Sequence, residues 1–149
     1  MRDDVAMSDF RLTIPATLPD VRLALARVDA AMLDLHCCAE TMDAARTTLA
    51  EVLNNIIEHA YAGQLGMIDI SLSAAGEALA FTVSDRGAPM PGGVLPRGDL
   101  PPETGVEDLP EGGFGWHLIR LLTDDLLYLR IGGENRLSFL VRQKQSGHI

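Results

Sequence analysis

One stretch decides how this chain folds: residues 49–63, LAEVLNNIIEHAYAG. Its apolar residues recur at the three- and four-residue spacing of a helix with one buried face: Leu49, Val52, Leu53, Ile56, Ile57 and Ala60. The spacing predicts a helix from about Glu40 to Ala62, and Gly63 is the residue expected to stop it. This helix is the reference point for the rest of the chain.

The polar side of the predicted helix carries residues that suit metal and nucleotide chemistry. Glu51 and Asn55 are four residues apart, which places their side chains on one face about 6 Å from each other, and His59 continues near that face. A carboxylate can accept a proton, and an amide oxygen is a hard ligand suited to Mg2+. The residues also fit an ordinary solvated helix face. Two adjacent asparagines inside an apolar helix, however, indicate partners other than water.

Further elements are predicted on both sides of this helix: strands at residues 9–14, 67–72, 79–83, 126–131 and 136–141, and helices at residues 20–36 and 116–122. Asp20 is the expected cap of the helix at 20–36, and Pro15 ends the first strand at a sheet edge. We expect an α+β fold, a two-layer sandwich with the helices packed on one face of a mixed, mostly antiparallel sheet.

The segment between the second hairpin strand and the last helix has a different composition. From Pro89 to Glu111 it holds six of the eight prolines, several glycines and five acidic residues, which cannot form a helix or a central strand. We predict a lid loop over about residues 88–112, because long loops in small domains are usually functional or disordered. No second-domain boundary is apparent, so residues 1–149 are expected to form one domain.

Charge and composition exclude several classes of function. The net charge of −9 argues against non-specific nucleic-acid binding, which depends on lysine and arginine. The chain has one lysine, Lys144, so a P-loop lysine cannot be placed. Cys37 and Cys38 are adjacent, which predicts reduced, mostly buried thiols rather than a disulfide or metal site. Without a leader or a membrane-spanning run, we expect a cytoplasmic protein with no membrane partner.

Two glycine-containing turns complete the set of candidate site residues. Asp85-Arg86-Gly87 follows a predicted strand, where the carboxylate can accept a hydrogen bond from an exocyclic amine such as that of adenine. Gly112-Gly113-Phe114-Gly115 precedes a predicted helix, where backbone N–H groups and the helix dipole favour phosphate without lysine. Taken alone, the first motif also fits a simple turn, and the second a flexible exit from the lid.

Together these motifs resemble a known family. Glu51-X-X-X-Asn55 followed by His59-Ala60-Tyr61, then Asp85-X-Gly87, then Gly113-X-Gly115 are similar in order and spacing to the N, G1 and G2 boxes of the GHKL ATPases. The short form resembles the stand-alone bacterial anti-sigma factor serine kinases over nearly the whole chain. The run at residues 112–125 and the later Gly-Glu-Asn-Arg-Leu carry most of this likeness. The resemblance implies the Bergerat ATP-binding fold.

The resemblance also implies a role for each motif residue, with ATP and Mg2+ as cofactors. Glu51 matches the general base, Asn55 the magnesium ligand and Asp85 the adenine contact. The backbone that cradles the nucleotide corresponds to three glycines and an intervening aromatic residue: Gly87, Gly113, Phe114 and Gly115. His59 is interpreted as a structural or pocket-lining residue rather than a phosphorylated one. Arg97, the only cation inside the lid, is a candidate for neutralising phosphate charge.

Two functions follow from the resemblance. The first is a partner-switching regulator that binds a sigma factor and phosphorylates a serine of a STAS-type anti-sigma antagonist. The second is a nucleotide-sensing module with little or no transferase activity, because the G1 motif continues as Ala88-Pro89 rather than through a further glycine and the lid holds few cations. A degenerate interaction domain is a third option. A homodimer is possible through exposed apolar residues expected on the first strand.

Overall fold

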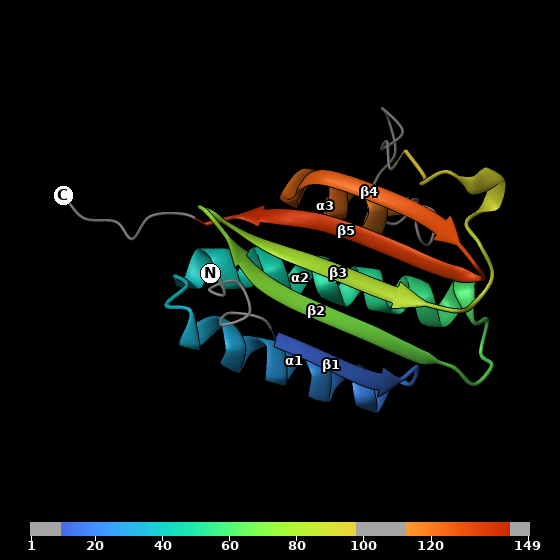
Figure 1. The fold of residues 1–149 in the computed structure, drawn as a ribbon, viewed down its shortest axis with the longest axis horizontal. Coiled ribbons are helices and arrows are strands. Elements are labelled where there is room, and N and C mark those ends of the chain that lie inside the picture. Colours follow the sequence, from blue (N-terminus) through green and yellow to red (C-terminus); the bar gives the residue numbers. More distant parts are fainter. Residues whose placement is uncertain (1–9, 98–112, 144–149) are drawn as a thin grey trace, which may run out of the picture.

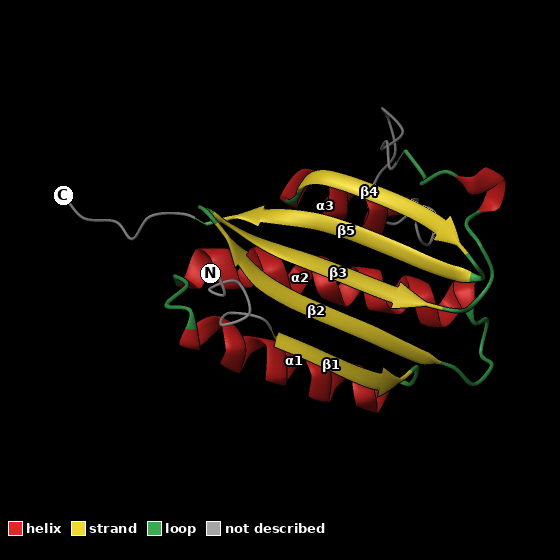
Figure 2. Ribbon diagram, in the orientation of Figure 1, coloured by secondary structure: helices red, strands yellow, loops and turns green. Residues whose placement is uncertain are grey.

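The computed structural model describes residues 10–97 and 113–143. Its elements are β1 (Phe10–Pro15), α1 (Leu18–Asp34), α2 (Ala39–Asn55), the π-helix η2 (Ile56–Ala60), β2 (Met67–Ala75), β3 (Ala78–Asp85), the short 3-10 helix η3 (Pro91–Gly93), α3 (Gly113–Leu122), β4 (Asp124–Ile131) and β5 (Glu134–Arg142). Every strand and main helix expected from the sequence is present. Figures 1 and 2 show α1, α2 and α3 together behind one sheet, so the α+β two-layer fold is confirmed.

The five described strands form one sheet in the order β1-β2-β3-β5-β4. All four pairings are antiparallel, so the described strands contain no parallel pair of the kind a mixed sheet implies. The two hairpins, β2–β3 and β4–β5, are joined side by side through β3 and β5. The register of that central pairing places Asp85 opposite Asn135. The last residue of the β2–β3 hairpin therefore lies beside the start of β5, close to the turn of the β4–β5 hairpin.

The core lies between the sheet and the three helices. Leu49 and Leu53 of α2 are fully buried against the sheet, as the sequence pattern predicts. On the sheet side, the rings of Phe81 and Phe139 stack across β3 and β5 with centroids 5.3 Å apart. Burying one such aliphatic or aromatic side chain stabilises the fold by about 1.5–3 kcal/mol. The central helix is therefore held rigidly on the sheet along its buried face.

The first helix begins earlier than the sequence suggests. The cap of α1 is Thr17, whose side-chain oxygen accepts a hydrogen bond from the backbone N–H of Asp20 at 3.2 Å. The prediction that Asp20 caps this helix is wrong, because Leu18 and Pro19 already belong to the first turn. Proline suits that position, since the first N–H groups of a helix have no intrahelical partner. Asp20 instead places its charge near the helix N-terminus.

The predicted helix from Glu40 to Ala62 is divided into two. Regular α-helix ends at Asn55, and residues 56–60 form a π-helical turn, closed where the N–H of Tyr61 donates to the carbonyl of Ile56 at 2.9 Å. Ala62 and Gly63 then both adopt positive φ. Apolar periodicity does not distinguish a π-turn from a continuing α-helix, and such turns occur often at functional sites. The widened turn begins immediately after Asn55.

Exposed apolar side chains lie on a different strand from the one expected. On β1, Ile14 is buried and Phe10 and Leu12 pack against the core, so the expectation of an exposed apolar first strand is wrong. The strand alternates, and its exposed residues are Arg11, Thr13 and Pro15. Of the exposed large apolar residues in the described strands, Met67 begins β2, and the other three lie on β4, the other edge strand: Leu127, Leu129 and Ile131.

The two cysteines lie in the turn between α1 and α2. Neither forms a disulfide, with Cys37 buried and Cys38 half-buried, as predicted from their adjacency. Burial raises the pKa of Cys37, whereas hydrogen bonding to Thr41 lowers the pKa of Cys38. Within the described residues, no helix has the length and hydropathy that crossing a bilayer requires.

Candidate functional site

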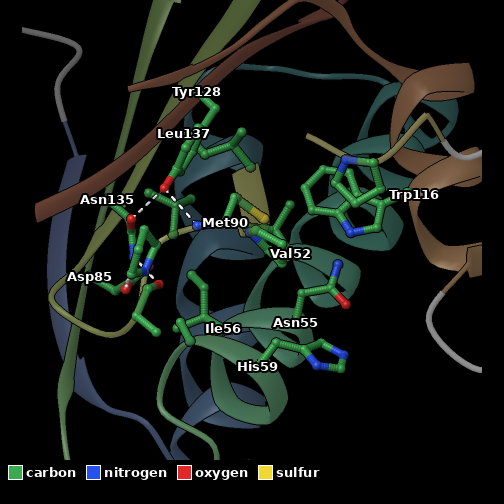
Figure 3. Close-up of a pocket in the computed structure, with 16 residues that line it drawn as sticks. Val52, Asn55, Ile56, His59, Asp85, Met90, Trp116, Tyr128, Asn135 and Leu137 are labelled. Atoms are coloured by element: carbon green, nitrogen blue, oxygen red, sulfur yellow. Dashed lines mark hydrogen bonds between the residues drawn. The ribbon is translucent and has the colours of Figure 1, made fainter. Parts of the chain in front are cut away.

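A pocket of about 580 Å³ lies between the end of α2, the end of β3, α3 and the β4–β5 hairpin. Most of its wall is apolar, with a few polar side chains at defined places (Figure 3). Its size and lining fit a small organic ligand with a flat apolar part. The wall is formed by Val52, Asn55, Ile56, His59, Ala60, Val83, Asp85, Ala88, Pro89, Met90, Pro91, Pro96, Trp116, Tyr128, Asn135 and Leu137.

Asn55 is the buried polar group of the helix wall. Its side chain is 8% exposed and lines the pocket, and its amide nitrogen is buried without a hydrogen-bond partner among the described residues. Leaving such a group unpaired costs about 1–3 kcal/mol. Buried polar groups in folded proteins almost always have a partner. An unpaired amide facing a cavity is therefore a strong indication that a polar ligand completes it.

Glu51 lies one helical turn before Asn55, next to α3. It does not line the pocket, and its carboxylate is half-buried against Gly115: a Cβ placed on Gly115 would overlap Oε1 of Glu51. With a Cβ at position 115, this carboxylate would have to move from its present place. The first and third sequence motifs, whose contacting residues Glu51 and Gly115 are 64 positions apart in the chain, therefore meet at a defined contact.

The third motif lies inside α3 rather than before it. The prediction of a helix starting near Trp116 is wrong by three residues, since α3 begins at Gly113. Gly113 and Gly115 consequently belong to its first turn, where backbone N–H groups lack intrahelical acceptors and the helix dipole favours anions. The side chain of Phe114 lies outside the described residues. The predicted chemistry of this motif, phosphate binding by exposed N–H groups, is compatible with either boundary.

Asp85 forms the polar end of the pocket. It is 5% exposed, and one carboxylate oxygen, Oδ1, accepts hydrogen bonds from the N–H of Gly87 at 2.8 Å and from Nδ2 of Asn135 at 2.8 Å. Burial raises the pKa of Asp85, and these two hydrogen bonds and the charge of Arg130 oppose that rise. No described residue donates to the other oxygen, Oδ2. The site thus offers one carboxylate oxygen to a ligand.

Gly87 allows the turn after β3 to pack on the end of the π-helix. A Cβ at Gly87 would overlap the carbonyl group of Ala60, and the N–H of Ala88 donates to that same carbonyl at 2.8 Å. Tyr61 fastens the arrangement, because its hydroxyl donates to the carbonyl of Met67 at 2.7 Å and accepts from the N–H of Arg86 at 2.9 Å. The first and second motifs therefore meet at this contact.

Three further residues of the site were not predicted from the sequence: Asn135, Tyr128 and Arg130. The hydroxyl of Tyr128 and the guanidinium of Arg130 both donate to Oδ1 of Asn135, at 2.6 and 3.0 Å. Figure 3 shows Asn135 between Tyr128 and Asp85. A signal was available, since Asn135 stands in the run Gly-Glu-Asn-Arg-Leu that carries part of the family resemblance. Its link to Asp85 depends on the register of β3 and β5, which the sequence alone did not provide.

A family model for the histidine kinase-like ATPase domain matches residues 14–140, which is most of the chain. The chain belongs to this family. The match runs from β1 into β5 and thus includes every element that surrounds the pocket.

Relatives of this histidine kinase-like ATPase domain include bacterial serine-protein kinases. The chain is 34% identical over 83 residues to the serine-protein kinase RsbW of Bacillus cereus, which covers 54% of this chain and 52% of that protein. It is 31% identical over 90 residues to the serine-protein kinase RsbW of Oceanobacillus iheyensis, covering 58% and 57%. The chain spans about half the length of the curated relatives it matches.

One solved structure shares the fold of the histidine kinase-like ATPase domain described here. The crystal structure of the RsbU and RsbW domains of a Mycobacterium tuberculosis protein matches 91% of this chain and 32% of that chain, with a TM-score of 0.65 and 17% sequence identity. At this level of identity the likeness concerns the arrangement of helices and strands.

The remaining predicted residues of the histidine kinase-like ATPase site, His59 and Arg97, lie at or near the edge of the pocket, and part of the predicted lid lies outside the described residues. His59 lines the rim with its side chain 67% exposed, and its Nε2 is 3.7 Å from Oε1 of Glu58. Arg97 is exposed and follows Pro96, which lines the pocket. Of the predicted lid, residues 88–97 are described and form part of the wall, whereas residues 98–112 lie outside the described residues.

The donor set of the described residues fits a magnesium ion carried by a nucleotide. No group of three or more His, Cys, Asp or Glu side chains in the described ranges could hold a metal by itself. Magnesium in proteins usually keeps several waters and takes one or two protein ligands plus substrate phosphates. The amide oxygen of Asn55 can supply such a ligand, because the side chain lines the pocket, and its unpaired Nδ2 can donate to a phosphate oxygen beside it. The residues therefore fit the metal–nucleotide pair that the family implies.

Proposed function

We propose that this chain binds Mg-ATP in the pocket and acts as an anti-sigma regulatory factor that phosphorylates a serine of an antagonist protein. The unpaired, buried amide of Asn55 is the observation that carries the nucleotide part, because it lies in the pocket that ends at the carboxylate of Asp85. The kinase part is supported by the relatives named serine-protein kinase RsbW. The chain's net charge of −9 is consistent with a protein partner and against nucleic acid.

In this proposal, different residues of the chain bind the base, face the phosphates and accept the serine proton. Asp85 accepts the exocyclic amine of adenine within the apolar part of the pocket. The N–H groups at the start of α3 face the phosphates, and Asn55 contributes its amide oxygen to the ion that offsets their charge. Glu51 accepts the proton of the serine hydroxyl as the phosphoryl group transfers. Gly115 holds open the space that this carboxylate occupies.

The partners belong to the same proposal. This chain binds a sigma factor, and a small STAS-type antagonist carries the serine that the chain phosphorylates. Both partners are met in the cytoplasm. A homodimer is compatible with this scheme, and the exposed apolar residues of β4 offer a surface for it.

The experiment that tests the proposal is a transfer assay with the cognate antagonist. The protein is incubated with Mg2+ and γ-labelled ATP, and phosphate on the antagonist serine is counted. We expect transfer by the wild type, retained ATP affinity in Glu51→Gln, and a loss of transfer of at least about a hundredfold in that variant. A serine-to-alanine antagonist is the control for the acceptor. Equal transfer by wild type and Glu51→Gln would reject the role of Glu51.

A second function is favoured by one feature of the pocket. Ala88, Pro89, Met90, Pro91 and Pro96 form an apolar wall where phosphate contacts are otherwise expected, and they contribute no charge. Because phosphoryl transfer needs phosphate charge to be neutralised, this uncharged wall favours a module that binds ATP and sequesters its partner without transferring phosphate. Calorimetry that shows ATP binding, together with no transfer to any serine of the antagonist, would select it over the kinase.

A further inference from the structure

Asn135 is a junction of hydrogen bonds between the two hairpins. Its side chain is 6% exposed, and its Oδ1 accepts from the hydroxyl of Tyr128 at 2.6 Å and from Nη1 of Arg130 at 3.0 Å. Its Nδ2 donates to Oδ1 of Asp85 at 2.8 Å and to the carbonyl of Ala88 at 2.8 Å. Both ends of the amide are therefore occupied by partners of the correct kind.

These partners determine which way the amide faces. A guanidinium can only donate, so the atom of Asn135 that faces Arg130 must be the oxygen. The hydroxyl of Tyr128 accepts from the N–H of Met90 at 2.9 Å, which leaves its own proton for Asn135. A flipped amide would set its NH2 group against these donors. Tyr128 and Arg130 thus fix Asn135 as a donor toward Asp85 (Figure 3).

The orientation of Asn135 decides what Asp85 can offer. Oδ1 of Asp85 already accepts from Asn135 and from the N–H of Gly87, so only Oδ2 remains for a ligand, and it remains as an acceptor. The carboxylate cannot shift easily. The turn that follows it is packed on Ala60, and its carbonyl at Gly87 accepts from Nη1 of Arg130 at 2.7 Å.

We propose that Asn135, held by Tyr128 and Arg130, is a positioning residue that presents Asp85 as a fixed acceptor and makes the pocket select 6-amino over 6-oxo purine nucleotides. The inference rests on the proposed function and adds the origin of base selectivity to it. A 6-oxo purine sets its carbonyl oxygen against Oδ2 of Asp85, and two acceptors cannot pair. A buried acceptor left unpaired in this way weakens binding strongly.

The charge around Asp85 shows how this selectivity can be altered. Arg130 from β4 and Glu134 from β5 act on it with opposite signs, Arg86 follows it in the chain, and His59 lies across the pocket on η2. Burial raises the pKa of Asp85, and the hydrogen bond from Asn135 is the strongest influence that opposes the rise. Replacing this donor with an acceptor therefore favours a protonated Asp85, which can donate to a 6-oxo group.

The test compares the affinities of ATP and inosine triphosphate, which differ only in the 6-position and the proton it places on N1. Calorimetry gives both Kd values for wild type, Asn135→Asp and Tyr128→Phe. Asn135→Asp keeps the shape of the side chain and replaces the donor with an acceptor. We expect it to lower the preference for ATP by about tenfold or more, and Tyr128→Phe to lower it by about two- to tenfold, in line with the loss of one hydrogen bond.

The matched control is Arg136→Gln, at the next position on β5. Arg136 points to the opposite face of the strand, is half exposed and contacts Glu134. We expect it to leave the ATP preference at the wild-type value. Circular dichroism confirms that each variant is folded. An ATP preference that is unchanged in folded Asn135→Asp would overturn the inference.

A second measurement needs no nucleotide. Carbon-13 NMR of the Asp85 carboxyl follows its titration in the free protein, and we expect Asn135→Asp to raise the midpoint while Arg136→Gln does not. Repulsion by the new carboxylate adds to this rise, so Tyr128→Phe, which adds no charge, is titrated beside it and should also raise the midpoint. Unchanged midpoints in both variants would count against the inference. If the wild type bound neither nucleotide, the proposed function and the base selectivity would both fail, and the titration would still decide whether Asn135 sets the state of Asp85.

Discussion

The buried amide of Asn55 is expected to lower the stability of the free protein and to be needed for nucleotide binding. Its amide nitrogen is buried and unpaired, so replacement by leucine, which is similar in size, removes a polar group that destabilises the free protein. We expect Asn55→Leu to raise the free energy of unfolding by about 1–3 kcal/mol in urea titrations, provided the pocket accommodates the new side chain without strain. Magnesium-dependent ATP binding should be lost in calorimetry.

Asn54 supplies the control for this substitution. It precedes Asn55 on the same helix and is only half-buried, and its side chain does not line the pocket. Asn54→Leu should therefore change the free energy of unfolding by less than about 0.5 kcal/mol and retain ATP binding. A loss of stability in Asn55→Leu together with retained nucleotide affinity would show that the amide is satisfied by the protein itself.

The pH dependence of the site follows from Asp85. Burial raises its pKa in the folded protein, so its contribution to stability is fully present below its unfolded pKa and is lost as pH rises through the folded value. Nucleotide binding has the opposite dependence, because the ionised carboxylate is the acceptor for the base. We expect ATP affinity to fall as pH falls through the folded pKa, while Asp85 favours folding over the same range.

Paired measurements separate these two effects. Calorimetry gives the ATP affinity and urea titration the unfolding free energy, each across the acidic range, for wild type and Asp85→Asn. The variant has no carboxyl at this position and should lose the stability change attributed to it. Parallel pH profiles of affinity in the two proteins would argue that another group controls binding.

At the scale of elements, the contact between α2 and α3 depends on a glycine inside a helix. Alanine is favoured over glycine within a helix by about 0.8–1.0 kcal/mol, yet a Cβ at Gly115 overlaps Oε1 of Glu51. We expect Gly115→Ala to displace the Glu51 carboxylate and to reduce phosphoryl transfer by more than about tenfold, with little or no gain in stability. The transfer assay and thermal unfolding measure the two effects.

A double-mutant cycle identifies the cause. In a Glu51→Ala background the overlapping carboxylate is absent, so adding Gly115→Ala should stabilise the protein more than it does in the wild-type background. An equal effect of Gly115→Ala in both backgrounds would mean that Glu51 and Gly115 are not coupled. The cycle reports on stability alone, so it does not require the protein to be an active kinase.

The elements themselves were largely predictable, and the reason is their amphipathic pattern. The stripe containing Leu49 and Leu53 predicts α2 correctly, and alternation predicts each of the five strands. The starts of helices were less predictable: α1 begins before Asp20 because Pro19 is tolerated in a first turn, and α3 begins at Gly113 within a glycine-rich run. The π-turn after Asn55 has no signature in a pattern of apolar residues.

At the scale of the whole molecule, nucleotide binding should be visible as global stabilisation. A ligand at a hundred times its Kd stabilises the native state by about 2.7 kcal/mol when it does not bind the unfolded chain. For a chain of this size the melting temperature should rise by roughly 5–10 °C. Thermal unfolding with and without Mg-ATP measures the rise, and Asn55→Leu should show none. A similar rise in that variant would place the nucleotide elsewhere.

The whole arrangement also shows what a sequence cannot supply. Local motifs predicted Glu51, Asn55 and Asp85. Asn55 follows Glu51 by four residues, and Gly87 follows Asp85 by two. Asn135 joins them only through the order β3-β5-β4 and the register that pairs it with Asp85. Tyr128 and Arg130 depend on that same register. Residues whose role is to hold another residue in place become visible only when the strands are assembled.

The wall of the pocket contains the chain's only tryptophan. Trp116 is 5% exposed and lies on α3, immediately after the third motif and across the pocket from Tyr128. Indole emission responds to the polarity and contacts of its surroundings, and no other tryptophan contributes to the signal. The protein consequently carries a built-in fluorophore in the wall of the pocket where the nucleotide would bind, so occupancy can be followed in solution without attaching a dye.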